Sequence, residues 1–186
     1  AAGAGAAAPG TAAGGAGADA SQQGTTCHSG LVIAEVLGVE LTAERAGELR
    51  VLGPLFLGLT VELSLGEVTA EPTELRRGSQ AARWDPPERR QLLWNTGDPS
   101  QRFLHCAVRD GGALGGELVL AGAGVVDLVE LAAAAEGSAT PCTVRLHAPP
   151  DEDDEAEEDE QDEDEGPLVG EAELVLTIVD MSNLAR

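Results

Sequence analysis

The sequence predicts an all-β domain, an eight-stranded antiparallel β-sandwich with one short helix and a disordered acidic loop. Short apolar segments alternate with turns of glycine, proline and acidic residues between residues 31 and 179. Within the segments, apolar and polar residues alternate, as they do in strands with one buried face. No long amphipathic helix pattern interrupts the series, so the strands are expected to pack as two sheets.

Each predicted strand is bounded by turn-forming residues. In the fifth strand, Leu104, Cys106 and Val108 share one face, while His105 and Arg109 lie on the other. The predicted strands cover residues 31–41, 54–65, 79–84, 90–95, 102–109, 116–121, 142–147 and 168–179.

Between the sixth and seventh strands the pattern changes from strand to helix. Residues 126–135 are rich in leucine and alanine, which are good helix formers, and Gly137 then ends the run. The sequence therefore predicts one short helix at this position.

Composition divides the chain into regions. Residues 1–29 are mostly alanine, glycine, serine and threonine, with Asp19 as the only charge, and are expected to be a disordered lead. Residues 30–181 form the predicted sandwich, and residues 182–186 are a short tail. The run 151–165 contains 13 acidic side chains among 15 residues, so it is interpreted as a solvated low-complexity insertion between the last two strands.

Charge and apolar content exclude several classes of partner and location. The formal net charge of −22 leaves no dominant basic surface, so nucleic acid is not an expected partner. The longest uncharged apolar stretch, Val51–Val61, is 11 residues and is too short to span a membrane. No secretory signal is visible, and the three cysteines Cys27, Cys106 and Cys142 do not form a disulfide framework. We therefore expect this chain to be part of a larger protein that is intracellular and cytoplasmic.

Several segments, taken in order, are similar to those of one known module. The segments are the opening Leu31–Leu41, Pro54–Gly66 with its alternating end, Trp84-Asp85, Phe103–Asp110 followed by Leu114-Gly115-Gly116-Glu117, and the closing Gly170-Glu171-Ala172-Glu173-Leu174. Together they resemble the C2 domain, in the circular permutant called type II, and the similarity spans roughly residues 30–180.

The resemblance implies a calcium site that this chain lacks. Calcium-binding C2 domains use about five aspartates from two loops, and calcium needs six to eight oxygen ligands. The first loop, residues 42–53, contains no aspartate, and Gly53 precedes Pro54 where the family carries Asp. Asp110 remains in the third loop, but Gly112 stands where the next aspartate would be. We therefore expect no metal and no cofactor, with Asp110 as a turn residue.

A basic cluster lies on or near the third and fourth predicted strands. Glu74, Asp85 and Glu88 are interleaved with its arginines. The cluster is interpreted as an exposed face with local ion pairs or as a docking surface for an acidic partner. The alternative is a patch for an anionic membrane surface, since each charge near such a surface contributes about 1 kcal/mol. The arginines are Arg76, Arg77, Arg83, Arg89 and Arg90.

Other chemical sites are not supported. Adjacent strand residues face opposite sides, so the pairs Cys27-His28 and His105-Cys106, with Cys142 near His147, do not predict a shared zinc site. No serine has a base at the spacing of a catalytic elbow, and Gly111–Gly116 lacks the ending of a phosphate-binding loop. An enzyme and a small-molecule substrate are therefore not expected.

The preferred hypothesis is a non-catalytic, calcium-independent C2-like module that acts in protein–protein docking or scaffold assembly. By family analogy, cytoskeletal and ciliary scaffolds are the expected setting. The alternative is peripheral binding to anionic phospholipid through the arginine cluster. A third hypothesis is that the acidic run 151–165 recruits a basic partner, or diffusely attracts cations, by charge alone.

Overall fold

The computed structural model describes residues 29–51, 57–111, 118–135, 137–149 and 166–180. The helices are α1 (Ala43–Val51) and α2 (Leu128–Ala135), and a short 3-10 turn covers Pro99–Gln101. The strands are β1 (Ser29–Leu41), β2 (Leu57–Leu65), β3 (Val68–Thr69), β4 (Arg76–Gly78), β5 (Ala81–Asn95), β6 (Phe103–Asp110), β7 (Val119–Asp127), β8 (Thr140–His147) and β9 (Leu168–Asp180).

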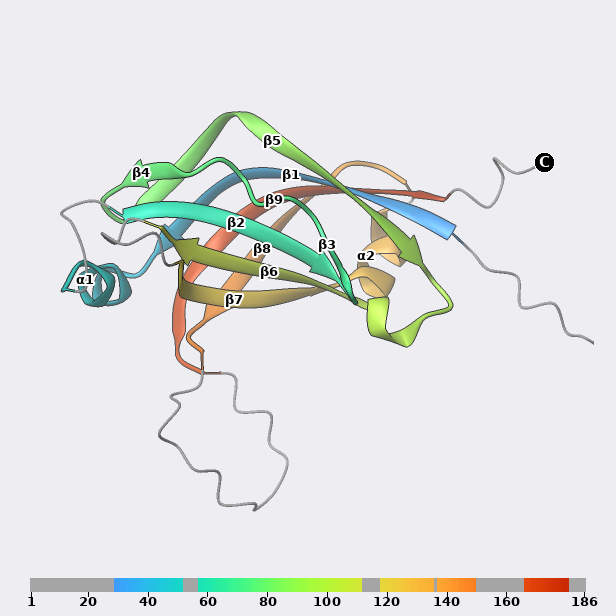
Figure 1. Cartoon of the computed structure of the whole chain (residues 1–186). Coiled ribbons are helices and arrows are strands. Elements are labelled where there is room, and N and C mark those ends of the chain that lie inside the picture. Colours follow the sequence, from blue (N-terminus) through green and yellow to red (C-terminus); the bar gives the residue numbers. More distant parts are fainter. Residues whose placement is uncertain (1–28, 52–56, 112–117, 136, 150–165, 181–186) are drawn as a thin grey trace, which may run out of the picture.

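The strands form two antiparallel layers (Figure 1). One layer has the order β5–β1–β9–β8 and the other has the order β2–β6–β7, with the short β3 and β4 both pairing with β2. A single residue pair, Ala123 of β7 opposite His147 of β8, joins the layers into one continuous path. The predicted all-β antiparallel sandwich is confirmed.

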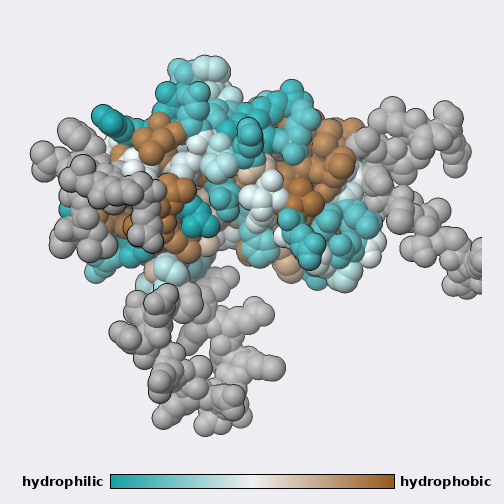
Figure 2. Space-filling view, in the orientation of Figure 1, coloured by the Kyte–Doolittle hydropathy of each residue, from teal (hydrophilic) through white to brown (hydrophobic). Residues whose placement is uncertain are grey.

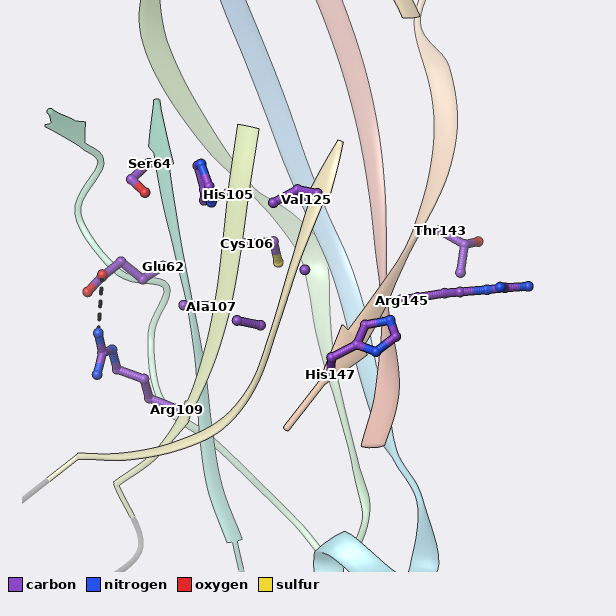
Figure 3. Close-up of a pocket in the computed structure, with 12 residues that line it drawn as sticks. Glu62, Ser64, His105, Cys106, Ala107, Arg109, Val125, Thr143, Arg145 and His147 are labelled. Atoms are coloured by element: carbon purple, nitrogen blue, oxygen red, sulfur yellow. Dashed lines mark ion pairs between the residues drawn. The ribbon is translucent and has the colours of Figure 1, made fainter. Parts of the chain in front are cut away.

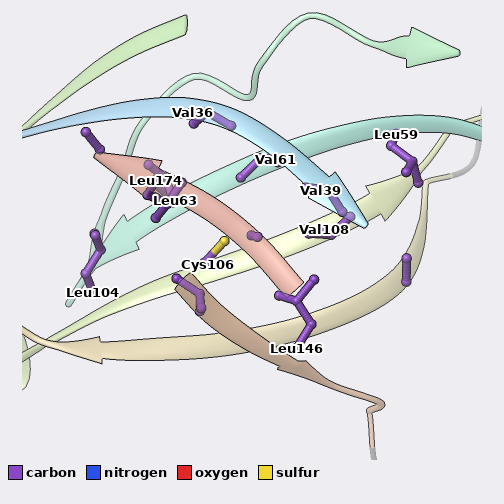
Figure 4. Close-up of a cluster of buried hydrophobic side chains, with 14 of the residues drawn as sticks. Val36, Val39, Leu59, Val61, Leu63, Leu104, Cys106, Val108, Leu146 and Leu174 are labelled. Carbon is purple, nitrogen blue, oxygen red and sulfur yellow. The ribbon is translucent and has the colours of Figure 1, made fainter. Parts of the chain in front are cut away.

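The space between the layers is filled by aliphatic side chains that point inward from alternate positions (Figure 4). Leu63 of β2 and Cys106 of β6 lie in this core with Val36 of β1 and Leu174 of β9, and each is at most 1% exposed. Burying one such aliphatic side chain contributes about 1.5–3 kcal/mol to stability. The alternation read from the sequence therefore places the core correctly.

The two strands expected at 79–84 and 90–95 are halves of one long strand, β5. Pro86 and Pro87 predicted a break, but β5 continues past them by bulging away from β1. The register moves from Val36 opposite Glu88 to Gly38 opposite Arg83, and Figure 1 shows the resulting bend. With β3 and β4 added, the described part of the chain has nine strands.

The expected loop at 42–53 contains helix α1. Thr42 caps it, since its hydroxyl oxygen accepts a hydrogen bond from the Arg45 backbone N–H at 3.2 Å. Ala46 and Leu49 are buried on the inner side of α1. Arg45 also donates from its guanidinium to backbone carbonyls of β7, including that of Ala121 at 2.9 Å. This end of the sandwich is therefore covered by a fixed helix.

The segment between β3 and β4 covers the outer edge of β2. The backbone N–H of Ala70 donates to the Leu63 carbonyl, and that of Thr73 donates to the Val61 carbonyl, both at 2.9 Å. The Thr73 hydroxyl, itself buried, accepts from the Val61 N–H at 2.9 Å. Residues 70–73 therefore act as an irregular extra strand.

Side chains of β5 form hydrogen bonds with the other side of the segment between β3 and β4. Trp84 donates from its indole nitrogen to the Glu74 carbonyl at 2.9 Å, and Glu88 accepts from the Glu74 N–H at 3.1 Å. Arg90 donates from Nε to the Glu71 carbonyl at 2.6 Å and from Nη2 to the next carbonyl at 2.8 Å. The two layers are thus joined along this seam by side chains rather than by a strand ladder.

The helix expected at 126–135 is confirmed as α2, which begins at Leu128. Asp127 caps it by accepting from the backbone N–H groups of Val129 and Glu130 at 2.9 and 3.3 Å. Arg102 pairs with the same carboxylate. The hydrogen bond from Arg102 is the main cause that lowers the pKa of Asp127, and the two backbone hydrogen bonds add to it.

Some predicted regions lie outside the described residues. These are the lead up to residue 28, the acidic run 151–165 and the tail 182–186. Among the helices that are described, none is long and apolar enough to cross a bilayer.

Candidate functional site

Asp110, the last residue of β6, lies at the end of the sandwich that carries α1. Its side chain is 4% exposed and points into the protein rather than into a turn. The carboxylate oxygen Oδ1 accepts a hydrogen bond from the Gly58 N–H at 2.7 Å, and the Gly111 N–H donates to the Gly58 carbonyl at 2.8 Å. Asp110 therefore fixes the start of β2 against the end of β6.

This arrangement leaves the Asp110 carboxylate with a structural partner. Calcium needs several further oxygen ligands from neighbouring loops. Across the described parts of the chain, no three His, Cys, Asp or Glu side chains are grouped as metal ligands would be. The expected turn role of Asp110 is corrected to that of a buried strand residue.

The five arginines of the predicted basic cluster do not share one face. Arg83 crosses β1 above Gly38 and pairs with Glu173 of β9, which raises the pKa of the arginine through the hydrogen bond. A side chain at residue 38 would displace the Arg83 side chain, since a Cβ there would lie 2.7 Å from Arg83 Cδ. Arg89 is exposed on the same outer face, whereas Arg90 is held in the seam.

The other two arginines lie on β4. Arg76 forms an ion pair with Glu74 at 3.3 Å. Arg77 is exposed beside Gly58 on the outside of the β2–β6–β7 layer, so it faces away from Arg83 and Arg89. Within the described chain, Arg77 and Arg89 form no ion pair, and they lie on opposite layers. A single membrane-facing patch made of all five arginines is not present in this fold.

A groove of about 720 Å³ lies along the outside of β6 and β7 and reaches β8 (Figure 3). Small residues of β7, Ala123 and Gly124, form its floor. Gly124 is required there because a Cβ would lie 2.0 Å from the Arg145 carbonyl oxygen. Sequence reasoning missed this groove, since it depends on the junction between β7 and β8.

The charged groups of the groove do not converge on one point. Glu62 and Arg109 pair with each other at 3.6 Å on one side. Figure 3 shows Arg145 extending away from β7 on the other side. His147 Nδ1 lies 2.6 Å from the Gly166 carbonyl oxygen, which fixes the start of the β8–β9 connection. The groove is therefore a recessed surface rather than a focused ligand site.

The cysteine thiols described here are protonated at neutral pH. Cys106 is completely buried, and desolvation raises the pKa of its thiol to about 12. Desolvation also raises the pKa of Cys142, which is partly buried. Because the thiolate is the reactive form, neither residue is an activated nucleophile. His105 points outward while Cys106 points inward, as the strand alternation predicted. Cys27 and His28 lie outside the described residues.

Apolar side chains reach the surface in several places. Figure 2 shows apolar surface toward both ends of the molecule, including the end at which β1 begins and β9 ends. Leu75 and Leu118 converge on Gly111 at the α1 end and are 46% and 45% exposed. Leu93 of β5 is 64% exposed near the start of β1. These surfaces are candidates for contact with a partner.

No protein-family model matches the sequence, and no curated protein matches it significantly.

Proposed function

We propose that this chain is a non-catalytic, calcium-independent, C2-like interaction module that docks proteins within a larger intracellular assembly. The observation that carries the proposal is the use of Asp110. The only aspartate that the C2 resemblance retains is buried and bonded to the Gly58 backbone, and α1 covers the same end. At this end, hydrogen bonds within the protein hold the start of β2 against the end of β6.

The strand arrangement supports the C2-like part of the proposal. Where the structure describes them, the segments that carry the resemblance lie on β1, β2, β5, β6 and β9, which form most of both layers; residues 54–56 and 114–117 lie outside the described part. A β-sandwich with rigid layers commonly uses its exposed surfaces for binding. A cytoskeletal or ciliary scaffold is the proposed setting, by analogy with degenerate C2 domains.

The test is thermal unfolding of the full chain with millimolar calcium, magnesium or a chelator. If free calcium were about a hundred times the dissociation constant of a site, binding would stabilise the fold by about 2.7 kcal/mol and raise the melting temperature by several degrees. We expect equal melting temperatures in calcium and magnesium, since the residues that the structure describes form no group of metal ligands. A rise specific to calcium would contradict the proposal.

Peripheral membrane binding is the second candidate, favoured by one observation. The exposed Arg77 lies near the half-exposed Leu75 and Leu118, so a cation and two apolar side chains share one area. Co-sedimentation with phosphatidylserine vesicles separates the candidates. Calcium-independent pelleting that is lost in Arg77→Ala but kept in Arg89→Ala would replace docking by membrane binding. We expect no pelleting in any sample.

A further inference from the structure

We infer that the outer face of the β5–β1–β9 layer binds a second copy of this chain. This inference rests on the proposed docking function and names both the surface and the partner. The surface contains an apolar patch, which we call the outer apolar patch. It consists of Leu31, Ile33, Leu93, Val175 and Val179.

One row of the patch crosses three neighbouring strands. Leu31 of β1 lies between Leu93 of β5 and Val179 of β9 in the sheet register, which forms a row of three aliphatic side chains. Ile33 follows Leu31 on the same face, between Gln91 and Thr177, and Val175 lies opposite Glu35 in the row after that. Leu93 is 64% exposed, and the other four are partly exposed.

The central strands of the layer therefore have apolar residues on both faces. The inward positions Val32, Ala34 and Val36 are fully buried in the core. An antiparallel sheet with one face in water normally has polar residues on that face, whereas near-continuous apolar runs are typical of strands covered on both faces. The segments Leu31–Ala34 and Leu174–Val179 are near-continuous apolar runs, interrupted only by Thr177. This pattern indicates that the outer face is covered.

Charges at the edge of the patch favour a second copy as the covering partner. Glu35 of β1 and Arg89 of β5 are neighbours in the register, directly beside the apolar rows. Neither side chain forms an ion pair with any described residue. A face that presents one free acid and one free base next to an apolar centre is complementary to itself, which is the requirement of a two-fold interface.

A two-fold axis parallel to the strands, between β1 and β5, satisfies these contacts. It sets Leu31 of each copy against Leu93 of the other. It also sets Glu35 of each copy against Arg89 of the other, which gives two acid–base pairs beside the apolar centre. Sheets pack face to face in this way in β-sandwiches, at a separation of about 10 Å.

The residues that flank the acidic run lie away from this interface. They are Pro149 and Gly166, and Gly166 lies beside His147. In Figure 1, β8 ends and β9 begins toward the α1 end, whereas β1 begins and β9 ends at the opposite end. The patch lies toward that opposite end, so the attachment points of the two runs are distant from the centre of the interface.

The first test is sedimentation equilibrium of the full chain across micromolar concentrations. We expect a reversible monomer–dimer equilibrium that Leu93→Glu weakens at least about tenfold, since it buries a charge in the apolar centre. The matched control is Val129→Glu, because Val129 is 52% exposed and lies on α2 outside the patch. A monomer at every concentration, or equal weakening by both variants, would overturn the inference.

Charge exchange at the interface edge gives a sharper test. Arg89→Glu groups four acidic side chains at the edge of the dimer, and Glu35→Arg groups four basic ones, so each variant alone should be monomeric. Mixing the two variants restores two acids and two bases, and native mass spectrometry should then show a heterodimer. Self-association of either variant alone, or no heterodimer after mixing, would contradict the two-fold arrangement.

The oligomeric state tests this inference, and the response of the melting temperature to calcium tests the proposed function. A strictly monomeric chain whose stability ignores calcium would refute the second copy while leaving calcium-independent docking intact. A calcium-specific rise in melting temperature would refute the proposed function even if the dimer formed.

Discussion

At the residue scale, Cys106 links the packing of the core to the response of the protein to alkaline pH. Burial raises the pKa of its thiol from 9.0 to about 12. The unfolded chain exposes this thiol and ionises it at lower pH, so the stability that Cys106 contributes is complete below pH 9.0 and is lost as the pH rises toward 12. We expect a loss of up to about 1.4 kcal/mol per pH unit in this window.

Urea unfolding between pH 8 and pH 11 measures this dependence, with Cys106→Ala as the comparison. Tyrosine and lysine do not titrate in this range in this protein, because the chain has neither: its 11 Lys and Arg residues are all arginines. The variant should be less stable at pH 8, because it leaves a small cavity. Its stability should fall less steeply with pH, and an equal slope in both proteins would contradict the assignment to Cys106.

At the element scale, the seam between β5 and residues 70–74 depends on Arg90. Its guanidinium donates to three backbone carbonyls, those of Glu71, Pro72 and Arg89, and to Glu88 at 2.6 Å, and it is 19% exposed. Arg90→Ala removes several hydrogen bonds from a charged donor, one of them to the partly buried Glu88, so we expect a loss of about 1–3 kcal/mol in the free energy of unfolding. Chemical denaturation of the variant measures this loss.

The neighbouring Arg89 is a matched control for Arg90. It lies on the same strand, carries the same charge and is exposed without an ion pair in the described structure. Arg89→Ala should change stability by less than about 0.5 kcal/mol, measured at a concentration where the chain is monomeric. Similar losses in both variants would show that charge, rather than the seam, determines the effect.

The same elements show how far the sequence could predict this structure. Alternation on β6 identified its core face, because period-two burial is a local pattern. Helix α1 was missed, although Thr42 before Ala43-Glu44-Arg45 is a capping signal, because a loop was expected from the family resemblance. The seam at Arg90 and the groove at Gly124 depend on which strands become neighbours, and no local pattern encodes that pairing.

The arginine cluster shows the same limit at the site. Residues that are close in sequence were expected to form one patch, but alternation along β5 points Arg89 outward and Arg90 toward the seam. Asp110 was singled out through the family resemblance, yet its role in the structure depends on Gly58, which is 52 residues away in the chain. Residue type was therefore predictable, whereas the contacts that define each role were not.

At the scale of the whole molecule, net charge opposes the compact state. The acidic run 151–165 holds 13 of the 33 carboxylates, and its removal changes the formal charge from −22 to −9. Repulsion among like charges destabilises a folded protein and is screened by salt over a Debye length of about 10 Å at 0.1 M. Where the run joins the domain, His147 and Ala148 are held by the backbone carbonyls of Gly166 and Pro167. These carbonyls remain when the run is replaced.

Replacing residues 151–165 by a glycine–serine linker of equal length tests this effect. We expect the melting temperature at low ionic strength to rise in the variant, because self-repulsion falls while the Ala148–Pro167 backbone hydrogen bond is kept. The gain should shrink as salt is added, since the wild-type chain is then screened as well. A lower melting temperature at every salt concentration would instead mean that the acidic side chains make stabilising contacts with the domain, and the run would then be part of the fold rather than a solvated insertion.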